Sequence, residues 1–358
     1  MGINLIKKGI MVALVIALIF TGGCTDKKGN SGDGQSSIIS PDIKINEQYY
    51  RGVLPYRKSP INGTMRALPN RLDASHFELT LFEYAKKTFN PATHVFAEGH
   101  ILTNAMIAPY ISAERDSIYE SFVYSMIEHD YYAEDGTFKG MVVGIIVSPT
   151  YYAKDEDGEY KRNVFGERIK ENYTGDELIE KSKTLLEDLT LLIRRETFVP
   201  IEFAVMRAEG NDTKIPGTFV LTASALIGER SVAKFTTVNE KFYLLPMAGS
   251  KLTDNETDIS RGFNQFKKDI AEFLPRFAGV TGLARFVDGN IVELKIEMYT
   301  EFDSSAEVIQ LTQFSIDRIS KYFPERIPIY LYVSTINNPK ALYIRSANGD
   351  DFMHIYRN

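Results

Sequence analysis

The chain has almost no cysteine: Cys24 is the single one among 358 residues. One cysteine cannot form an intramolecular disulfide, and small exported domains often need disulfides for stability. The hydrophobic core of the folded part must therefore be sufficient by itself. If Cys24 is chemically modified, the chain also has no free thiol for catalysis or for a thiolate metal site.

The chain also lacks an apolar run long enough to cross a membrane. Its longest run, residues 10–20, has roughly eleven residues, whereas a spanning helix needs about 20. Two lysines precede this run, and two glycines follow it and end at Gly23. A positive start, a short apolar centre and small residues are typical of a secretory signal peptide, which we assign to residues 1–23.

Cys24 directly follows these small residues, and the sequence around it resembles the bacterial lipobox. The resemblance implies that the thiol receives a diacylglyceryl group and that the chain is cut between Gly23 and Cys24. Thr21 stands where a lipobox usually has leucine, so a plain signal peptide or an uncleaved anchor is the alternative. Several acyl chains, at about 0.8 kcal/mol per buried CH₂, anchor a protein stably. We expect processing by lipoprotein enzymes and a lipid anchor at the outer face of the cytoplasmic membrane.

Residues 24–46 are rich in Gly, Ser, Asp and Lys and have few large apolar side chains. Such a segment cannot bury enough surface to offset its ordering entropy, so we predict a flexible tether. Loss of residues 1–23, whose charges are two lysines, changes the formal net charge from −6 to −8. Nucleic acid and anionic headgroups repel an acidic domain, so we expect no nucleic-acid partner and no general electrostatic attraction to the membrane.

The folded part shows the same order of predicted elements twice. An apolar strand at 140–152 precedes a helix at 176–195, and a second strand at 290–302 precedes a helix at 304–323. Further strands follow each helix, at 198–207 and 215–224 in the first half and at 327–335 and 338–347 in the second. Pro200 and Pro328 correspond just inside the strands that follow the helices. Earlier in the halves, helices are predicted at 74–89 and at 260–274.

These patterns predict an α+β fold with two related halves, each with helices packed on a mostly antiparallel sheet. We place the first half at 47–238 and the second at 239–358. A polar insertion at 153–175 makes the first half longer. One larger sheet that repeats by chance is the alternative.

Several segments resemble the CamS family, the sex pheromone lipoproteins of Firmicutes. The resemblance rests on YYRGVLPY (49–56), NRLD (70–73), Glu98-Gly99 and GTFKGMVVGIIVSPTYY (136–152), and it runs along nearly the whole chain. It implies two products of one precursor: a lipoprotein and a short apolar pheromone peptide cut from the end of the signal sequence. The corresponding peptide here is Ala17-Leu18-Ile19-Phe20-Thr21-Gly22-Gly23. Its Gly-Gly ending departs from the family pattern, so residues 17–23 are alternatively the plain end of a signal peptide.

Sequence motifs of catalysis and metal binding are missing. No His-Glu-x-x-His and no Gly-x-Ser-x-Gly occurs, and the five histidines do not have the spacing of two ligands on one helical turn. Acidic clusters at 155–159 and 254–258 do not follow the EF-hand pattern, and we interpret them as solvated loops. We therefore expect no metal, no cofactor and no enzymatic activity.

The mature part is instead expected to be a binding or interaction module for an unknown small molecule or peptide. Arg51, Tyr56, Arg57 and Arg71 stand beside Pro and Gly residues, where a loop can present cationic and aromatic side chains to an anionic ligand. Local pairing of the arginines and packing of the tyrosines is the alternative. A cell-envelope hydrolase or transferase would instead require Asp73, Glu98 and His100 to converge in one cleft.

Overall fold

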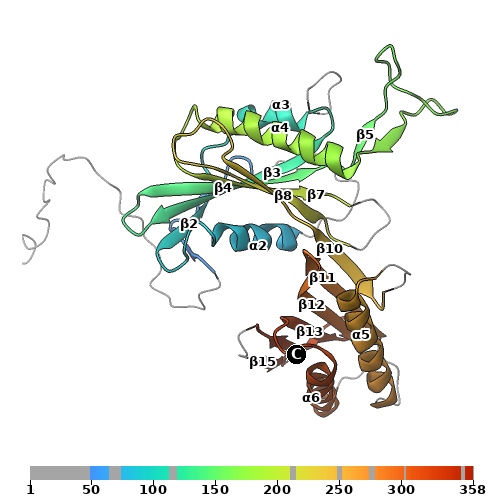
Figure 1. Ribbon diagram of the computed structural model, residues 1–358. Coiled ribbons are helices and arrows are strands. Elements are labelled where there is room, and N and C mark those ends of the chain that lie inside the picture. Colours follow the sequence, from blue (N-terminus) through green and yellow to red (C-terminus); the bar gives the residue numbers. More distant parts are fainter. Residues whose placement is uncertain are drawn as a thin grey trace, which may run out of the picture. The chain divides into compact units, whose positions relative to one another are not determined.

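The computed structural model describes residues 49–63, 74–112, 119–209, 215–247, 252–273, 279–301, 304–347 and 351–357. The predicted signal peptide, Cys24, the predicted tether, Arg71 and Asp73 lie outside these ranges. The described chain forms two larger sheets, a two-stranded sheet and five helices, which confirms the predicted α+β class (Figure 1). Within the described ranges, no helix combines the length and apolar character needed to cross a membrane.

The first sheet has seven strands in the order β1-β2-β3-β4-β7-β8-β9. The pairs β1·β2 and β4·β7 are parallel, and the other neighbours are antiparallel. The strands are β1 (Arg51–Gly52), β2 (His94–Glu98), β3 (Val123–Ala133), β4 (Phe138–Val147), β7 (Ile201–Arg207), β8 (Thr218–Ala225) and β9 (Lys234–Thr237). A small sheet of β5 (Thr150–Tyr152) and β6 (Lys170–Asn172) stands apart from them.

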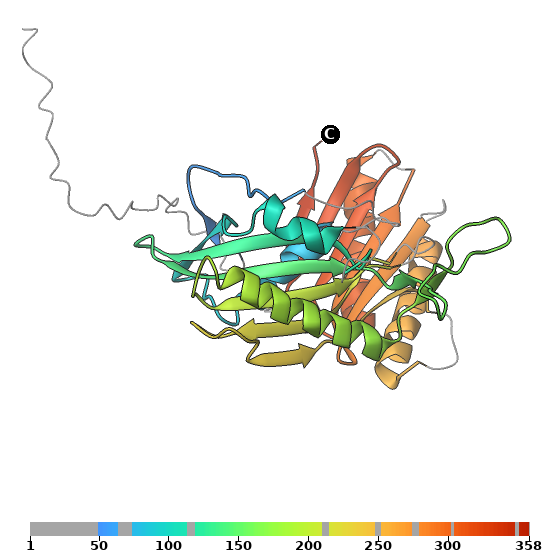
Figure 2. The same cartoon turned by 90° about the horizontal axis from the view of Figure 1, so that it is seen from above.

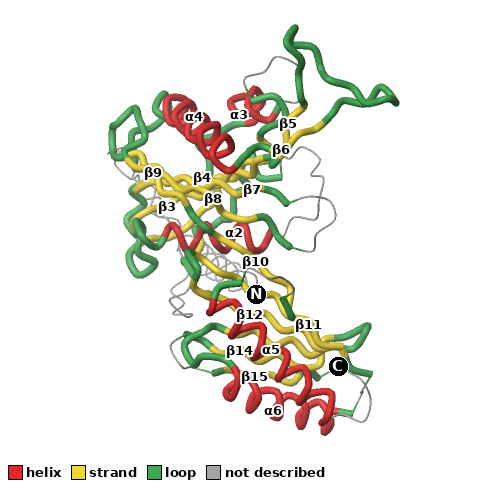
Figure 3. Tube along the Cα trace, turned by 45° about the vertical axis from the view of Figure 1, so that its right-hand side comes forward, coloured by secondary structure: helices red, strands yellow, loops and turns green. Residues whose placement is uncertain are grey.

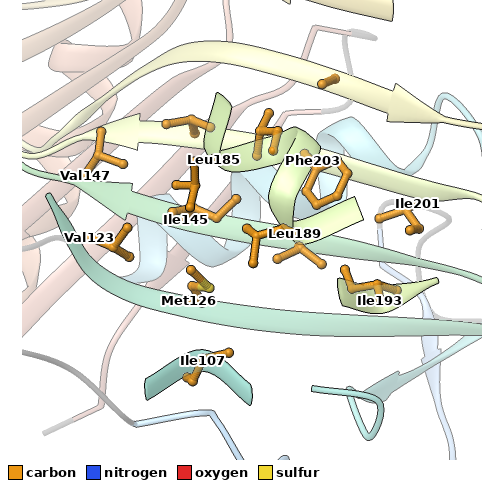
Figure 4. Close-up of a cluster of buried hydrophobic side chains, with 14 of the residues drawn as sticks. Ile107, Val123, Met126, Ile145, Val147, Leu185, Leu189, Ile193, Ile201 and Phe203 are labelled. Atoms are coloured by element: carbon orange, nitrogen blue, oxygen red, sulfur yellow. The ribbon is translucent and has the colours of Figure 1, made fainter. Parts of the chain in front are cut away.

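Helices cover both faces of the first sheet. The helices α3 (Asn104–Ile111) and α4 (Gly175–Ile193) lie on one face, and α2 (Ala74–Ala85) lies on the other (Figures 1 and 2). Strand β4 is therefore buried on both sides: Ile145 and Val147 join the core under α3 and α4 (Figure 4), while Val142 and Ile146 join the core under α2. A side chain at Gly144 would collide with α2, because its Cβ would lie 2.5 Å from Leu81 Cδ1.

The second sheet has six strands in the order β10-β11-β12-β13-β14-β15, with one parallel pair, β12·β13. The strands are β10 (Glu240–Leu245), β11 (Gly279–Val287), β12 (Asn290–Tyr299), β13 (Ile329–Ser334), β14 (Pro339–Arg345) and β15 (Phe352–Ile355). Helices α5 (Asp254–Phe273) and α6 (Ser305–Tyr322) pack side by side on one face (Figure 3). Gly262 permits this approach, because a Cβ there would lie 2.7 Å from the carbonyl oxygen of Tyr322.

Eight elements of the first half have the same order and the same pairing as the eight elements of the second, whereas β1, α2, β5 and β6 have no counterpart. The series β2-α3-β3-β4-α4-β7-β8-β9 corresponds to β10-α5-β11-β12-α6-β13-β14-β15, and parallel and antiparallel pairs fall at the same places. The predicted boundary at 238/239 falls between β9 and β10. This correspondence supports the predicted repeat, although a common origin of the halves stays a prediction.

Two details differ from the expected repeat. The sequence predicted helices at 74–89 and 260–274 as the early helices of the two halves, but the structural counterpart of α5 is α3 and not α2. The sequence did not reveal α3, because a helix of so few turns has no clear apolar period. Pro200 and Pro328 lie directly before β7 and β13 rather than inside them. Their equivalence still holds, because the Pro200 carbonyl accepts from Met141 N at 3.1 Å and the Pro328 carbonyl accepts from Leu294 N at 3.0 Å.

A buried ion pair joins elements of both halves. Arg285 on β11 donates through Nε to Glu240 Oε1 at 2.6 Å, and its side chain is 8% exposed while that of Glu240 is fully buried. Glu240 Oε2 accepts from Phe219 N on β8 at 2.6 Å. Arg285 Nη1 also lies 3.4 Å from Glu83 Oε2 on α2. Although burial opposes ionisation, His76 and Arg285 hold the pKa of Glu240 below its ordinary value.

We expect Arg285→Ala to lower the free energy of unfolding by about 3–5 kcal/mol, because it leaves the buried Glu240 carboxylate without its partner. The control is Arg261→Ala, which removes an ion pair with Asp258 whose two side chains are each 67% exposed. The control should lose no more than about 1 kcal/mol. Denaturant unfolding of both variants measures the difference, and equal losses would contradict the structural role of the buried pair.

Candidate functional site

Three consecutive ionisable residues interrupt the apolar strand β3: Glu128, His129 and Asp130. Glu128 and Asp130 are completely buried, and His129 is 3% exposed. Charged residues are seldom buried unless other groups satisfy them. Here the partners come from residues 99–103, the loop that connects β2 to α3.

Backbone amides of this loop surround the Glu128 carboxylate. Ile101 N donates to Glu128 Oε1 at 2.9 Å, and Leu102 N donates to Oε2 at 2.8 Å. Gly99 N donates to the Glu128 carbonyl at 2.8 Å. Any side chain at Gly99 would overlap Glu128 Cγ, so this glycine permits the loop to lie directly on the carboxylate. Thr103 then caps α3 by accepting from Met106 N.

Asp130 holds His100 at the surface of the same loop. Asp130 Oδ2 accepts from His100 N at 3.1 Å and also bonds to His100 Nδ1. The hydroxyl of Tyr132 lies 3.1 Å from the same ring nitrogen, and the ring of Phe138 packs edge-on at 5.5 Å. The His100 side chain is 56% exposed, so the imidazole is fixed on one side and open to solvent on the other.

Burial changes the protonation of this cluster. It raises the pKa of Glu128 to about 8, and the charge of Asp130 adds to the shift, while the amides of Leu102 and Ile101 oppose it. Burial also raises the pKa of Asp130, against the influence of His100. The hydrogen bond to Asp130 raises the pKa of His100, although burial opposes this shift.

The cluster therefore buries one carboxylate charge near neutral pH rather than two. Asp130 Oδ1 is buried without a hydrogen-bond partner among the described residues. A protonated Glu128, two residues along the same face of β3, is a suitable donor for it. Asp130 then faces the His100 ring and favours its charged form, and the open side of this ring can bind an anion or exchange a proton.

The segment after β1 brings further polar groups to this site. Tyr56 Oη donates to Glu98 Oε1 at 2.9 Å, and Ser59 N donates to Glu98 Oε2 at 2.7 Å. Arg57 is exposed. The hydrogen bond to Asp130 raises the pKa of His100, burial raises the pKa of Tyr132, and the charge of Arg57 opposes both shifts, so Arg57 acts on the same surface. We call Arg57, His100 and Tyr132 the His100 surface. Tyr56 is not part of it, because its partner Glu98 lies opposite His129 on the face of the sheet that α2 covers.

The family is decided by the sequence comparison. The family model described as "CamS sex pheromone cAM373 precursor" matches residues 56–351. The chain belongs to the CamS family. A search of the curated proteins found no match.

Solved structures of two such precursors have a similar fold. The sex pheromone precursor from Lactobacillus salivarius subsp. salivarius UCC118 has a TM-score of 0.76 at 22% identity, covering 89% of this chain and 99% of that one. The C-terminal domain of the sex pheromone staph-cAM373 precursor from Staphylococcus aureus has a TM-score of 0.67 at 21% identity, covering 81% and 98%. At this identity the likeness concerns the fold alone.

The structure places the predicted site residues of this CamS-family chain in different surroundings. Arg57 lies at the His100 surface, whereas Tyr56 is bound to Glu98 and Arg51 forms an ion pair with Glu134. Glu98 binds Tyr56 and Ser59, whereas His100 binds Asp130. Glu98 and His100 therefore do not converge as the hydrolase alternative requires. Arg71 and Asp73 lie outside the described residues.

Sequence reasoning missed Glu128, Asp130 and Tyr132. Their signal was available, because three ionisable residues in the middle of an apolar strand indicate a satisfied polar cluster. The middle residue, His129, is different: burial lowers its pKa to about 3, and its ring packs on Phe82 and Phe96. Among the described residues, no group of His, Cys, Asp or Glu has the arrangement of a metal site.

The cluster predicts that the domain is less stable at higher pH. Folding raises the pKa of Glu128 from 4.5 to about 8, so the folded state keeps a proton that the unfolded chain has lost within that window. The pKa values of Asp130 and His100 are also raised by folding, so both groups change the stability in the same direction as Glu128. Burial of His129, whose pKa falls from 6.5 to about 3, has the opposite sign and offsets the effect of Glu128 up to about pH 6.5. We therefore expect the free energy of unfolding to fall between about pH 6.5 and 8, by on the order of 2 kcal/mol.

Denaturant unfolding at a series of pH values measures this slope. Glu128→Gln should flatten it, because the neutral amide cannot titrate. Glu180→Gln is the control, because this carboxylate on α4 is 71% exposed. A slope that Glu128→Gln leaves unchanged would show that Glu128 does not retain its proton.

Proposed function

We propose that this chain is the precursor of an exported lipoprotein, anchored through Cys24, whose folded part is a binding module. Membership of a family described as sex pheromone precursors supports export and the release of residues 17–23 as a peptide. The observation that carries the binding role is the fixed His100 imidazole: Asp130 holds one nitrogen, and the ring is more than half exposed. Such a preorganised polar group on a loop is typical of binding surfaces.

The chemistry of the His100 surface favours a small anionic ligand, such as a phosphate group or the carboxylate of a short peptide. Arg57 provides positive charge, and the raised pKa of His100 favours the charged form of its imidazole. Hydrogen bonds to a charged partner are stronger than neutral ones. Tyr132 adds an aromatic ring that stacks on His100 with the ring centroids 6.3 Å apart. The structural fixing of the loop by Glu128 reduces the entropy that binding must offset.

The envelope hydrolase or transferase is the less favoured proposal. It would use His100 as a general base oriented by Asp130, which is an arrangement that enzymes do use. However, no serine, threonine or cysteine side chain hydrogen-bonds to His100 among the described residues. The binding role needs no such nucleophile.

Nuclear magnetic resonance of the histidine rings tests the binding role. Titration with inorganic phosphate, or with trialanine as a carboxylate probe, should shift the His100 ring resonances, and Arg57→Ala should weaken binding about tenfold or more. Arg261→Ala is the control, because it removes an exposed arginine on α5. Equal shifts of His94, His100 and His354 would contradict a specific site.

Mass spectrometry of strains with the natural chain and with Cys24→Ala tests the precursor role. Membranes from the natural strain should yield an N-terminal fragment that starts at Cys24 and carries diacylglyceryl, and the supernatant should contain Ala17–Gly23 or its fragments. Cys24→Ala should abolish the lipid modification, because the thiol is the acceptor. An unmodified Cys24 in the natural strain would overturn the proposed anchor.

A further inference from the structure

An arm, residues 150–172, projects from the first half between β4 and α4 (Figures 1 and 2). The sequence indicated only a polar insertion here. The structure shows that β5 and β6 form its base, with Thr150 opposite Asn172 and Tyr152 opposite Lys170. Beyond this base the chain forms two successive turns, and each has an ordered hydrogen-bond network.

The two turns are built alike, eight residues apart. In the first, Asp155 Oδ1 accepts from Asp157 N and Glu159 N at 3.1 and 2.9 Å. In the second, Asn163 Oδ1 accepts from Phe165 N and Glu167 N at 2.9 and 3.0 Å. Each turn has a glycine in the left-handed region, Gly158 at φ +79° and Gly166 at φ +82°.

The base of the arm is closed by a ring of backbone hydrogen bonds. Ala153 N donates to Ile169 O, Ile169 N donates to Lys161 O, and Lys161 N donates to Ala153 O, each at 2.9 Å. The Arg168 guanidinium lies over the rings of Tyr160 and Tyr152, at 4.1 and 5.4 Å from their centroids. The arm is therefore a fixed support for its two turns rather than a solvated loop of no defined shape.

The turns differ in what they present. The first turn presents Glu156 and Asp157, whereas the second presents Val164 and Phe165, which are 94% and 85% exposed. Neither apolar side chain packs against a core, so folding of the arm does not require them. An apolar pair held at the tip of an ordered turn indicates contact with something outside the chain.

The charge around the apolar turn is opposite to that of the whole protein. Four cations, Lys161, Arg162, Arg168 and Lys170, outnumber the nearby Glu167 and Glu171. Arg162 also fixes the turn, because its Nη1 donates to Gly166 O at 2.6 Å. The first turn is acidic, so a negatively charged surface attracts one turn of the arm and repels the other.

We propose that Val164 and Phe165 insert into the headgroup region of an anionic lipid bilayer, while the basic residues at 161–170 contact lipid phosphates. Two side chains are too small for a stable protein interface, which buries ~1,200 Å² or more, whereas a bilayer needs no matching shape. The inference rests on the proposed anchor at Cys24. The chain from Cys24 to Tyr49 extends to roughly 80 Å at most, which lets the arm reach the membrane that holds the anchor.

A single tryptophan tests this insertion, because the natural chain has none. Full-length Phe165→Trp is mixed with vesicles of phosphatidylcholine alone, or of phosphatidylcholine with the anionic lipid phosphatidylglycerol, whose charge attracts basic residues. We expect the emission to shift to shorter wavelength, with quenching by brominated lipid, only with the anionic vesicles. Adding Val164→Ser should weaken insertion about tenfold.

Ile336→Trp is the matched control, because this residue, between β13 and β14, is 93% exposed and outside the arm. Its emission should stay that of a tryptophan in water. The proposal is overturned if the emission of Phe165→Trp stays like that of Ile336→Trp, or if both vesicle types shift it equally. It is also overturned if the emission of Phe165→Trp shifts with protein concentration alone, which would indicate docking on a second copy. Mass spectrometry of the Cys24 fragment in the same sample reports separately whether the anchor exists.

Discussion

The burial of two carboxylates on β3 is the constraint on which the candidate site depends. Glu128 and Asp130 are inaccessible to water, so their oxygens must be satisfied by donors within the protein. The loop from Gly99 to Leu102 supplies donors to three of the four oxygens, through three backbone amides and one imidazole. A loop that would otherwise be mobile is thereby fixed, and His100 is fixed with it.

The same constraint gives the site its chemistry. Placing two carboxylates close together in a region of low dielectric makes it costly to ionise both. The raised pKa of Glu128 follows from this, and so does the pairing of Asp130 with His100. The exposed side of the imidazole, Arg57 and Tyr132 then form a surface whose charge depends on pH. The buried polar residues of β3 therefore hold the exposed His100 ring of the proposed binding surface in place.

The sequence predicted the long, strongly periodic elements well and the short ones badly. The helices α4 and α6, and the strands after them, lie close to their expected positions because each has an apolar face at helical or alternating spacing. The eight-residue α3 contains Pro109, and its apolar side chains are not confined to one face, so no periodic pattern in the sequence predicted it. The arm was recognised only by its polarity, since its order comes from side-chain caps and backbone contacts between turns rather than from an apolar period.

By itself the sequence determined the single cysteine, the family and the α+β class, and it predicted a leader. Each of these depends on neighbouring residues or on periodicity, which are visible in a linear chain. Tertiary structure alone decided that His100 pairs with Asp130 rather than Glu98, and that Val164 and Phe165 stand at an exposed tip. The first depends on the register between β2 and β3, which brings together groups 30 residues apart. The second depends on the absence of any packing partner, and only a folded chain reveals which side chains its core leaves uncovered.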